Sequence, residues 1–483
     1  MTQLASVLIA NRGEIAVRIA RTARDLGIRS IAVYTEADAE SMHAAIADEA
    51  YAIPSYLDIP ALIDVALRTG ASCVHPGYGF LSENADFARA VQDAGLVWVG
   101  PSPEAIETLG NKISARALAR EVNAPLAPGT EEPISDWQDA LAFAEEHGLP
   151  IAIKAAFGRS LTVVRDVGDI EHAFASASRE AQAAFGRSEC FVEKFLPRPR
   201  HVEAQVLADA LGNIIVLSTR DCSVQRRFHK LIEEAPAPFL SEWHNSEIIE
   251  GARAICRAAD YTGAGTVEFI VAADGTISFL DFNTRIQVEH PITEAITGID
   301  IVAEQFRIAA GHPLSVIEDP VPTGHAFEFR INAEDIAHGF VPSPGTITAF
   351  EPPTGPGLRI DSGVRTGSPV SGTYDSLLAK LIVTGPTRAI ALLRARDALK
   401  EFSIRGVRTT LPFHRDMVEH PSFAGSDLAV YTDWVDHNYQ PGLSTDVEDI
   451  ASLHEERMSF AVEVNGRLHQ VTIPASSLMA EEN

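Results

Sequence analysis

The first hundred residues alternate short apolar segments with amphipathic segments, and this alternation restricts the fold more than any other feature. Residues 7–10 are apolar, and Ile15, Ile19 and Leu26 then recur at helical spacing before Gly27, which is suited to end a helix. The alternation continues, with further strands expected at 30–34, 71–74 and 96–99 and helices at 59–67 and 85–94. Strands that alternate with helices predict a parallel, doubly wound sheet.

A dinucleotide-binding domain would show the same alternation of strands and helices. Such a domain carries a Gly-x-Gly-x-x-Gly turn directly after its first strand. The first strand here runs instead into Asn11, Arg12, Gly13 and Glu14. The sequence therefore disfavours dinucleotide binding.

The remainder of the chain has a different character. Strands with hairpin turns lie between helices from about residue 112 to 310, which predicts an α+β region built on antiparallel sheet. A third region follows, with strands expected at 325–331 and 376–383 and a helix at 388–402. In the tail, residues 460–464 and 468–473 flank Asn465-Gly466, which predicts a β-hairpin.

Composition excludes several classes of partner. With 39 Lys and Arg against 66 Asp and Glu, the formal net charge is −27, which repels nucleic acid and anionic lipid. No apolar run approaches about 18 residues and no basic segment precedes one at the start, so we expect a cytoplasmic protein without membrane partners. The four cysteines are widely separated, which argues against a zinc site or a disulfide framework.

The most informative pattern surrounds a turn expected at Asp274-Gly275. If these two residues form the whole turn, Ala273 lies opposite Thr276 and Glu268 lies opposite Asp281. Like charges directly opposite on a sheet, with side-chain origins about 5 Å apart, are destabilising and require a cation. Mg²⁺ or Mn²⁺ would fit, because these ions bind through carboxylates together with substrate phosphates.

The strand after this turn is expected to continue with period two as far as residue 289. One face would then carry five polar side chains: Asp281, Asn283, Arg285, Gln287 and Glu289. An ordinary solvated strand face is the alternative interpretation. The acid pair across the hairpin favours a site for a metal, a small oxyanion and a proton transfer.

Seven motifs, in this order, resemble those of biotin carboxylases of the ATP-grasp superfamily. They lie at residues 9–15, 75–84, 220–223, 233–238, 283–291, 329–335 and 374–378. The resemblance spans about residues 5–430 and points to the α-subunits of actinobacterial-type acetyl- or propionyl-CoA carboxylases. It implies four regions. They are an N-terminal biotin carboxylase domain at 1–112, an ATP-grasp domain at 113–320 with a lid at about 125–200, a C-terminal biotin carboxylase α+β domain at 321–435, and a tail without a biotinyl domain at 436–483.

The resemblance also implies an activity. Biotin carboxylases are ligases that convert ATP and bicarbonate to carboxyphosphate, from which CO₂ passes to the ureido nitrogen of biotin. No Met-Lys-Met sequence is present and the last lysine is Lys400, so biotin is expected on a separate carrier protein. The implied cofactors and substrates are ATP, Mg²⁺ or Mn²⁺, bicarbonate and carrier-bound biotin. The implied partners are the carrier, a carboxyltransferase subunit and a second copy of the chain, in fatty acid metabolism.

Residue roles follow from the same resemblance. Glu289 matches the base that deprotonates bicarbonate, and Arg330 matches the arginine that stabilises the biotin enolate and phosphate. The residues matching bicarbonate-binding groups are Arg285, Gln287, Val288 and Lys230, of which Arg285 and Lys230 are also expected to be catalytic. Those matching the nucleotide site are Lys112, Lys154, Glu193, Lys194, Leu196, His201 and Gln225. Those matching the metal site are Glu268, Asp281 and Asn283.

The sequence departs from the family most clearly after Lys154. Biotin carboxylases carry four consecutive glycines in a loop there, whereas this chain has Ala-Ala-Phe-Gly-Arg-Ser and three fewer glycines. Glycines let backbone N–H groups approach phosphates closely, so the shortened loop is expected to donate fewer hydrogen bonds to ATP. Asn111, Phe228, His229 and Asp281 are further departures.

Two alternatives to an active biotin carboxylase remain open because of these departures. One is a catalytically impaired subunit that keeps the fold for a structural or regulatory role. The other is an ATP-grasp ligase that carboxylates an acceptor other than biotin.

Overall fold

The computed structural model describes residues 2–130, 132–155, 161–185 and 190–441, together with the backbone of two strands at 457–464 and 467–474. The chain divides into two units, Met1–Tyr439 and Gln440–Asn483, and each is described by itself.

A five-stranded parallel sheet with the order β3-β2-β1-β4-β5 forms the N-terminal part of the first unit. Its strands are β1 (Ser6–Ile9), β2 (Arg29–Tyr34), β3 (Glu49–Ala52), β4 (Cys73–His75) and β5 (Val97–Trp98). The helices around it are α1 (Gly13–Asp25), α2 (Met42–Ile46), α3 (Ile59–Arg68), α4 (Ala85–Asp93) and α5 (Pro103–Gly110). The predicted doubly wound parallel sheet is confirmed. Gly27, at φ 72°, follows α1 as expected.

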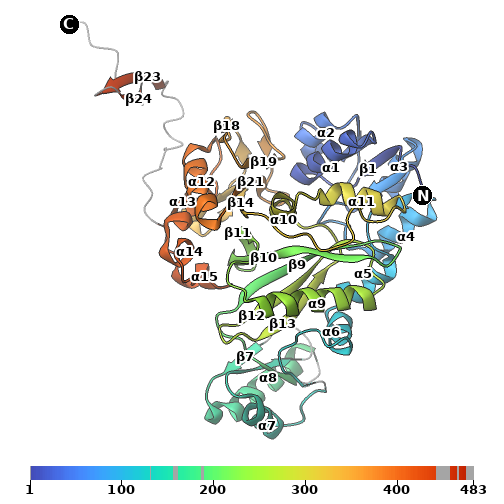
Figure 1. Cartoon of the computed structure of the whole chain (residues 1–483), viewed down its shortest axis with the longest axis vertical. Coiled ribbons are helices and arrows are strands. Elements are labelled where there is room, and N and C mark those ends of the chain that lie inside the picture. Colours follow the sequence, from blue (N-terminus) through green and yellow to red (C-terminus); the bar gives the residue numbers. More distant parts are fainter. Residues whose placement is uncertain are drawn as a thin grey trace. The chain divides into compact units, whose positions relative to one another are not determined.

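The largest sheet is antiparallel and has eight strands, in the order β13-β12-β9-β10-β11-β14-β21-β19 (Figure 1). Its strands are β9 (Arg200–Ala208), β10 (Ile214–Arg226), β11 (His229–Ala235), β12 (Gly263–Val271), β13 (Ile277–Asn283), β14 (His325–Asn332), β19 (Leu358–Ser362) and β21 (Leu377–Gly385). Strands from both sides of residue 320 therefore share one sheet, because β11 pairs directly with β14.

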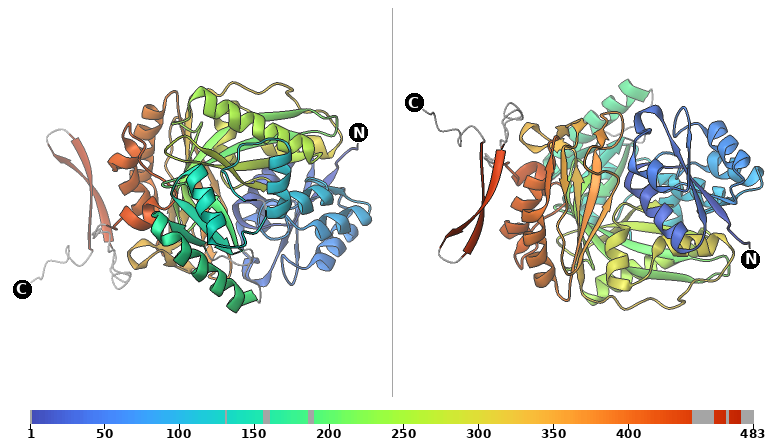
Figure 2. Two further views of the ribbon diagram at one scale, coloured as in Figure 1. Left: turned by 90° about the horizontal axis from the view of Figure 1, so that it is seen from below. Right: turned by 90° about the horizontal axis from the view of Figure 1, so that it is seen from above.

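Helices cover this sheet on both faces, as the views in Figure 2 show. They are α6 (Lys112–Glu121), α9 (Glu242–Ala258), α10 (His290–Thr297), α11 (Ile301–Ala309), α12 (Arg388–Glu401), α13 (Leu411–Glu419), α14 (Pro421–Ala424) and α15 (Trp434–Asn438). Phe327, Phe329 and Leu381 pack in the core that includes residues of α12. On the opposite face, Ile292 and Ile296 of α10 pack against β14 and β21.

A smaller sheet with the order β7-β6-β8 has its own apolar core. Its strands are β6 (Ile151–Ala155), β7 (Leu161–Val164) and β8 (Cys190–Lys194), and α7 (Trp137–His147) and α8 (Ile170–Phe185) cover it. Ile151, Ile153 and Val192 from the strands pack with Phe143 of α7 and Ala173 of α8. The shortened loop predicted to cover phosphates joins β6 to β7, and its residues 156–160 lie outside the described residues.

The remaining elements are short strands and 3₁₀ turns. They are β15 (Glu334–Asp335), β16 (Val341–Pro342), β17 (Gly345–Thr346), β18 (Ala349–Glu351), β20 (Pro369–Val370), β22 (Ser403–Arg405), η1 (Glu36–Asp38), η2 (Val167–Asp169) and η3 (Ile336–His338).

The second unit contains the hairpin predicted for the tail. Strands β23 (Arg457–Val464) and β24 (Arg467–Pro474) pair antiparallel, with Val464 opposite Arg467. The predicted turn residues, Asn465-Gly466, lie outside the described residues.

The turn between β12 and β13 is longer than the sequence predicts, so this prediction is wrong. Ala273 does not lie opposite Thr276, because the amide of Ala272 donates to Thr276 O at 2.9 Å. Asp274 Oδ1 accepts a hydrogen bond from Thr276 N at 3.0 Å, and Gly275 has a φ of 88°. Aspartate side chains commonly close turns in this way, and here the result is a loop of more than two residues.

The two acidic side chains nevertheless face each other. Phe269 pairs with Phe279, but a bulge then shifts the register so that Glu268 pairs with Asp281. The bulge adds Leu280 to one strand and so compensates for the longer turn. The predicted pair of opposed carboxylates is confirmed.

The predicted continuation of the strand to residue 289 is also wrong. β13 ends at Asn283, and the amide of Thr284 donates to Glu83 Oε1 at 3.2 Å rather than to a neighbouring strand. Glu83 Oε2 accepts a second hydrogen bond, from Arg285 Nε at 2.9 Å. A side chain from the N-terminal region thus replaces the strand partner, and the chain turns towards α10.

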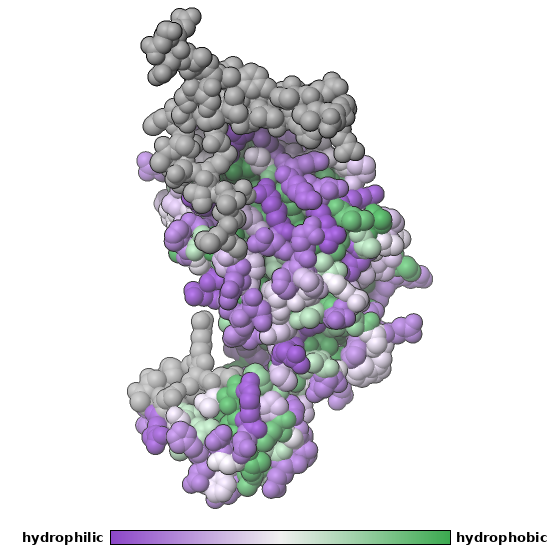
Figure 3. All heavy atoms as spheres, turned by 90° about the vertical axis from the view of Figure 1, so that its left-hand side faces the viewer, coloured by the Kyte–Doolittle hydropathy of each residue, from purple (hydrophilic) through white to green (hydrophobic). Residues whose placement is uncertain are grey.

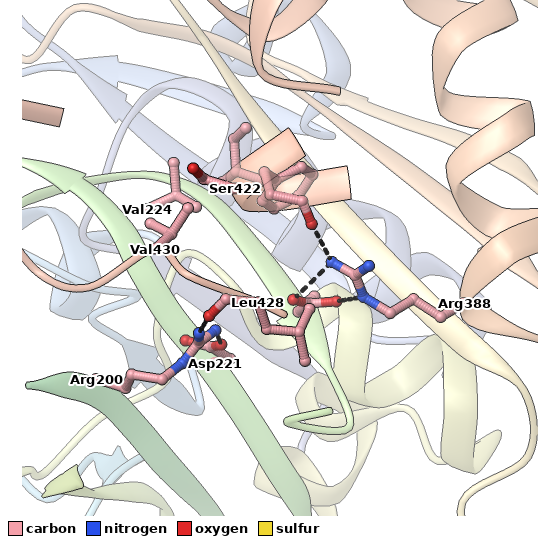
Figure 4. A pocket seen from close by; sticks show the side chains of 10 residues that line it. Arg200, Asp221, Val224, Arg388, Ser422, Leu428 and Val430 are labelled. Atoms are coloured by element: carbon pink, nitrogen blue, oxygen red, sulfur yellow. Dashed lines mark hydrogen bonds and ion pairs between the residues drawn. The ribbon is translucent and has the colours of Figure 1, made fainter. Parts of the chain in front are cut away.

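Two arginines join the segment after α13 to the large sheet (Figure 4). Arg388, at the start of α12, donates to both carboxylate oxygens of Glu234 at 2.7 and 3.2 Å and to Phe423 O at 3.0 Å. Arg200 of β9 donates to Leu428 O. The cavity that they line has a volume of about 10 Å³, which is room for one water molecule.

Candidate active site

Lys230 of β11 is the centre of a buried group of carboxylates. Its ammonium contacts Glu203 of β9, Glu268 Oε1 at 3.1 Å and Glu289 Oε1 at 2.7 Å. Burial alone would lower the pKa of Lys230, but these three carboxylates outweigh burial and raise the pKa well above its ordinary value. Lys230 is therefore a fixed positive charge.

Arg220 of β10 lies next to this group, and its side chain is fully buried. Its guanidinium donates to Glu203 Oε2 at 3.0 Å and also to the amide oxygen of Gln287. Further acceptors are Gln205 Oε1 at 2.6 Å, Thr293 Oγ1 at 3.0 Å and Thr266 Oγ1 at 3.1 Å. Because an arginine with five acceptors has little freedom, Gln287 is held in one orientation.

Glu289 lies between two cations. Its Oε2 accepts from Arg330 Nη2 at 2.9 Å, while its Oε1 faces Lys230. Burial would raise the pKa of Glu289, but Lys230, Arg330 and Arg220 outweigh burial and lower it well below the usual range. The carboxylate is ionised, so it can accept a proton.

Arg330 is held from its other side by Glu233 of β11. Arg330 Nε donates to Glu233 Oε1 at 2.6 Å, and the two side chains are buried or nearly so. One guanidinium thus bridges two carboxylates, with Glu233 behind it and Glu289 in front. The planar guanidinium allows this bridging, because its Nε and Nη2 donors point in fixed directions towards the two carboxylates.

The residues expected to bind metal lie together at the edge of this group. Asn283 Nδ2 and Gln287 Nε2 donate to Glu268 Oε1 at 2.8 and 2.9 Å. Burial raises the pKa of Asp281, and the facing carboxylate of Glu268 raises it further, although Lys112 opposes this. Two carboxylates are a donor pair that fits Mg²⁺, and a cation there would relieve their repulsion. The amide oxygen of Asn283 accepts from Arg285 in this structure, so it would have to turn to join them.

The residues expected to bind bicarbonate join this group through the segment after β13. Arg285 Nη2 donates to Asn283 Oδ1 at 3.0 Å, and its Nε is held by Glu83. The carbonyl of Val288 accepts from the buried Lys380 Nζ at 2.8 Å, which fixes the peptide that leads into Glu289.

Two of the residues expected at the nucleotide also belong to this group. His201 Nε2 lies 3.1 Å from Glu268 Oε2. Gln225 Nε2 lies 3.3 Å from His201 Nδ1 and donates to Cys222 O at 2.9 Å. His201 and Gln225 therefore adjoin the carboxylates rather than forming a separate pocket.

The other residues expected at the nucleotide are placed differently. Lys154 of β6 forms an ion pair with Glu193 of β8. Lys194 Nζ donates to three carbonyl oxygens, at residues 147, 148 and 149, at 3.0, 3.1 and 3.2 Å, so it caps the end of α7. Leu196 is half-buried just beyond β8, and Lys112 is exposed at the first position of α6. Lys154, Glu193, Lys194 and Leu196 belong to the small sheet and its surroundings. Lys112 lies instead on α6, which packs against β13, and its charge acts on Asp281.

Two central residues were not selected from the sequence. Glu203 and Glu233 are fully buried, yet each makes an ion pair at the centre of the site. The available signal was a glutamate beside apolar residues, Val202 and Ala204 for Glu203 and Leu231 and Ile232 for Glu233, since buried charges in proteins are normally paired. Glu203 pairs with Glu268 across β9 and β12, a strand order that local sequence does not reveal.

The described surface in Figure 3 is mainly hydrophilic. Hydrophilic residues cover most of the described part of the face in Figure 3, and hydrophobic residues occur between them in separate groups. Among the described residues, no helix has both the length and the apolar character needed to cross a membrane.

Comparison with known families places this site in a class. Residues 111–317 match the family model for the ATP binding domain of the carbamoyl-phosphate synthase L chain. Together with the antiparallel sheet and the buried acid–base group, this match defines an ATP-grasp ligase. Residues 3–106 and 328–437 match the N-terminal and C-terminal domains of biotin carboxylase. The chain belongs to the biotin carboxylase family.

Individual relatives agree with this assignment. The chain is 53% identical to the biotin-dependent acyl-coenzyme A carboxylase alpha3 subunit of Mycobacterium leprae, over 99% of this chain and 82% of that one. It is 47% identical to the biotin carboxylase of a Nostoc species, over 88% of this chain and 97% of that one. The biotin carboxylase domain of a thermophilic 2-oxoglutarate carboxylase bound to bicarbonate has a TM-score of 0.86 at 39% identity, over 90% of this chain and 98% of that one.

Proposed function

We propose that this chain carboxylates biotin with ATP and bicarbonate, as the biotin carboxylase subunit of an acyl-CoA carboxylase. The observation that carries the proposal is the buried, ionised Glu289 held between Lys230 and Arg330, directly beside the opposed carboxylates Glu268 and Asp281. A base, two cations and a metal-binding pair are what the conversion of bicarbonate to carboxyphosphate requires. The name of the Mycobacterium leprae relative supports the acyl-CoA carboxylase assignment.

The proposed roles begin with bicarbonate. Arg285 binds the anion through parallel hydrogen bonds, and Gln287 and the backbone of Val288 orient it. Lys230 supplies the charge that favours a dianionic form, and Glu289 takes the proton. The freed oxygen then attacks the γ-phosphate of ATP, and ADP leaves.

The same residues serve the second half of the reaction. Carboxyphosphate releases CO₂ and phosphate, and the phosphate takes the proton of the ureido nitrogen of biotin. The nitrogen of the resulting enolate then attacks the CO₂. Arg330 stabilises the negative charge on the biotin enolate and phosphate, because its guanidinium already faces the position of the base. Glu233 keeps Arg330 in this orientation throughout.

Glu268, Asp281 and Asn283 would hold Mg²⁺ or Mn²⁺, which supplies charge to the transferring phosphoryl group when bound. Lys112 and Lys154 bind the phosphates of ATP, and Glu193, Lys194 and Leu196 lie beside the adenine. Lys154 must leave Glu193 to reach a phosphate, since the two are paired in this structure. His201 and Gln225 complete the nucleotide site from the side of the large sheet.

The proposal extends to organisation and partners. We assign an N-terminal domain at 1–112, an ATP-grasp domain at 113–320 with a lid at about 125–200, and a C-terminal domain at 321–435. The biotin is carried by a biotin carboxyl carrier protein or domain and is used by a carboxyltransferase subunit, in a cytoplasmic complex that contains two copies of this chain.

The test is ATP hydrolysis that depends on bicarbonate. We expect it to rise with free biotin or a biotinylated carrier. If ATP with Mg²⁺ fails to raise the melting temperature, the chain is a non-catalytic subunit. If bicarbonate-dependent turnover occurs without any response to biotin, the acceptor is a different molecule.

A further inference from the structure

Glu328 of β14 is a buried carboxyl group that the proposed mechanism does not use. It lies directly opposite Glu233 of β11 and opposite Ile382 of β21 in the sheet register. Residues that are opposite on neighbouring antiparallel strands point to the same face, with side-chain origins about 5 Å apart. Two carboxyl groups, both with no exposed surface, therefore stand side by side.

These two carboxyl groups lack partners on the sides where they meet. Neither oxygen of Glu328 has a hydrogen-bond partner among the described residues, and the same is true of Glu233 Oε2. The other oxygen of Glu233 is bound to Arg330 Nε at 2.6 Å. Three buried acceptor oxygens without a donor are costly, because a buried polar atom without a hydrogen bond loses its hydration and gains nothing.

An apolar layer seals Glu328 from solvent. Ile292 and Ile296 of α10 pack over the same face of the sheet with Ala326 and Ile382, which flank Glu328 along β14 and across to β21. An ionised, unpaired carboxylate in such surroundings is strongly disfavoured. A second carboxylate on the neighbouring strand makes ionisation of both groups more costly still.

The nearby cations are already engaged. Arg330, two residues along β14, bridges Glu233 and Glu289. Lys380 lies opposite Arg330 in the register of β14 and β21. Its ammonium contacts Glu14 Oε1 at 3.1 Å and donates to the Val288 carbonyl at 2.8 Å.

The titratable side chains of α10 are His290 and Glu294, and Glu294 is paired with Arg18 and Arg359. Burial together with the positive charge of Lys380, Arg18 and Arg359 lowers the pKa of His290 well below the ordinary value, so His290 stays neutral and supplies no charge.

We propose that one proton is held between Glu233 and Glu328 in the folded protein, and that this protonated pair positions Arg330 against Glu289. Glu328 is the neutral member, because Glu233 is bound to a guanidinium. The proton comes from solvent during folding, and a small rotation of either carboxyl group lets it bridge the two. Because Glu328 is neutral, Glu233 keeps its negative charge, and this charge holds Arg330.

The titration behaviour of the two groups is consistent with this arrangement. Burial raises the pKa of Glu328 well above the ordinary value, against the opposing effect of Lys380. Burial also raises the pKa of Glu233 to about 7, although Arg330 opposes it. At neutral pH the pair therefore binds a proton that two separate surface glutamates would have lost.

Infrared spectroscopy tests the proton directly and needs no turnover. The unsubstituted protein at about pH 8 should show absorption from protonated carboxylic acids, and part of this absorption should disappear in Glu328→Gln. Glu234→Gln is the matched control. Glu234 is the next residue to Glu233 and is also buried, but His325 and Arg388 outweigh burial and lower its pKa, so the spectrum in that region should not change.

Thermal unfolding gives a second measurement. The pKa of Glu328 is higher in the folded than in the unfolded protein, so its stabilising contribution is complete at acid pH and is lost as the pH rises. Glutamine mimics the neutral acid at every pH. The melting temperature of Glu328→Gln, relative to the unsubstituted protein, should therefore increase from about pH 5 to about pH 8. A relative melting temperature that stays constant or falls, with an unchanged infrared spectrum, would overturn the proposal.

The positioning role rests on the proposed function and is tested separately. Glu328→Gln should keep turnover close to that of the unsubstituted protein, while Glu328→Leu should lower kcat by about 100-fold, because Arg330 is misplaced. The KM for ATP should change in neither variant. If both variants fold and turn over equally well, Glu328 does not position Arg330. If no variant turns over at all, the infrared and thermal results still decide where the proton is.

Discussion

Arg330 Nη2 and Glu289 Oε2 lie 2.9 Å apart, so the proposed base of the reaction is already bound to the arginine that is expected to act on the second substrate. With Lys230 on its other oxygen, Glu289 has a pKa well below its usual range and is a weak base in this state. A bicarbonate anion that draws Lys230 and Arg330 towards itself would remove part of that effect. Substrate binding would then raise the pKa of Glu289 at the moment when the proton must be taken.

Replacing the proposed base should abolish the chemistry without affecting nucleotide binding. We expect Glu289→Gln to lower bicarbonate-dependent ATP hydrolysis by about 10²- to 10⁴-fold, the usual contribution of a general base. The rise in melting temperature caused by ATP and Mg²⁺ should persist. Glu247→Gln, at an exposed position on α9, is the control. Normal turnover in Glu289→Gln would show that another group takes the proton.

The length of the side chain at residue 281 should determine the metal requirement. Asp281 is one methylene shorter than the glutamate of the family, and Mg²⁺ tolerates little displacement of its ligands. Asp281→Glu should therefore lower the Mg²⁺ concentration for half-maximal turnover. Asp281→Asn should raise it by about tenfold, or about 1.4 kcal/mol. A titration of activity against Mg²⁺ distinguishes these outcomes, and identical curves for all three proteins would remove residue 281 from the metal site.

Acid should weaken the ion pair between β19 residues Arg359 and Asp361. Arg359 donates to both oxygens of Asp361, at 2.9 and 2.7 Å. Burial would raise the pKa of Asp361, but Arg359 and Lys380 outweigh it and lower the pKa. The stabilisation is therefore present above the unfolded pKa and is lost as the pH falls.

Asp361→Asn should cost about 2 kcal/mol near neutral pH, the value for hydrogen bonds to charged groups. Its difference in melting temperature from the unsubstituted protein should shrink as the pH falls below about 4. Asp64→Asn, which removes an exposed pair with Arg68 at 3.6 Å, should change little at any pH. A pH-independent difference for Asp361→Asn would mean that ionisation of Asp361 contributes nothing.

Arg388→Met should detach the segment that follows α13. Arg388 is bound to the buried Glu234 and to Phe423 O, and it stacks over the ring of Phe423 at 5.4 Å. Removing one member of a buried ion pair costs about 3–5 kcal/mol. Limited proteolysis should show faster cleavage between residues 421 and 441. Arg405→Met, whose pair with Glu351 is more than half exposed on both sides, should leave cleavage unchanged.

Periodicity predicted the parallel sheet and the strand and helix pattern of the third region, because each depends on local spacing. The opposed carboxylates were also predicted, but from a two-residue turn that the structure does not have. Periodicity was wrong in other places as well. It failed where a distant side chain intervened. Glu83, from the N-terminal region, binds the amide of Thr284 and ends β13, and no local pattern contains that information. The turn at Asp274 was longer than expected because its own side chain closes it, and a bulge restored the register of Glu268.

The centre of the site was harder to predict for a related reason. Glu203 reaches Lys230 only because β9 lies beside β12 and β10 in the sheet, and Glu233 meets Glu328 only because β11 pairs with β14. Sheet order depends on the packing of the whole chain. The motifs identified the segments that carry the site, and the structure added the residues that hold them.

The pairing of β11 with β14 limits where this chain can be divided into fragments that fold separately. Lys230 and Arg330 lie on these two adjacent strands. The backbone hydrogen bonds between β11 and β14 therefore set the spacing between the group proposed to act on bicarbonate and the group proposed to act on biotin. A fragment that ended near residue 320 would leave β11 as a bare edge, prone to join another chain. Separate expression of the two halves should therefore yield insoluble products unless the cut lies outside this sheet.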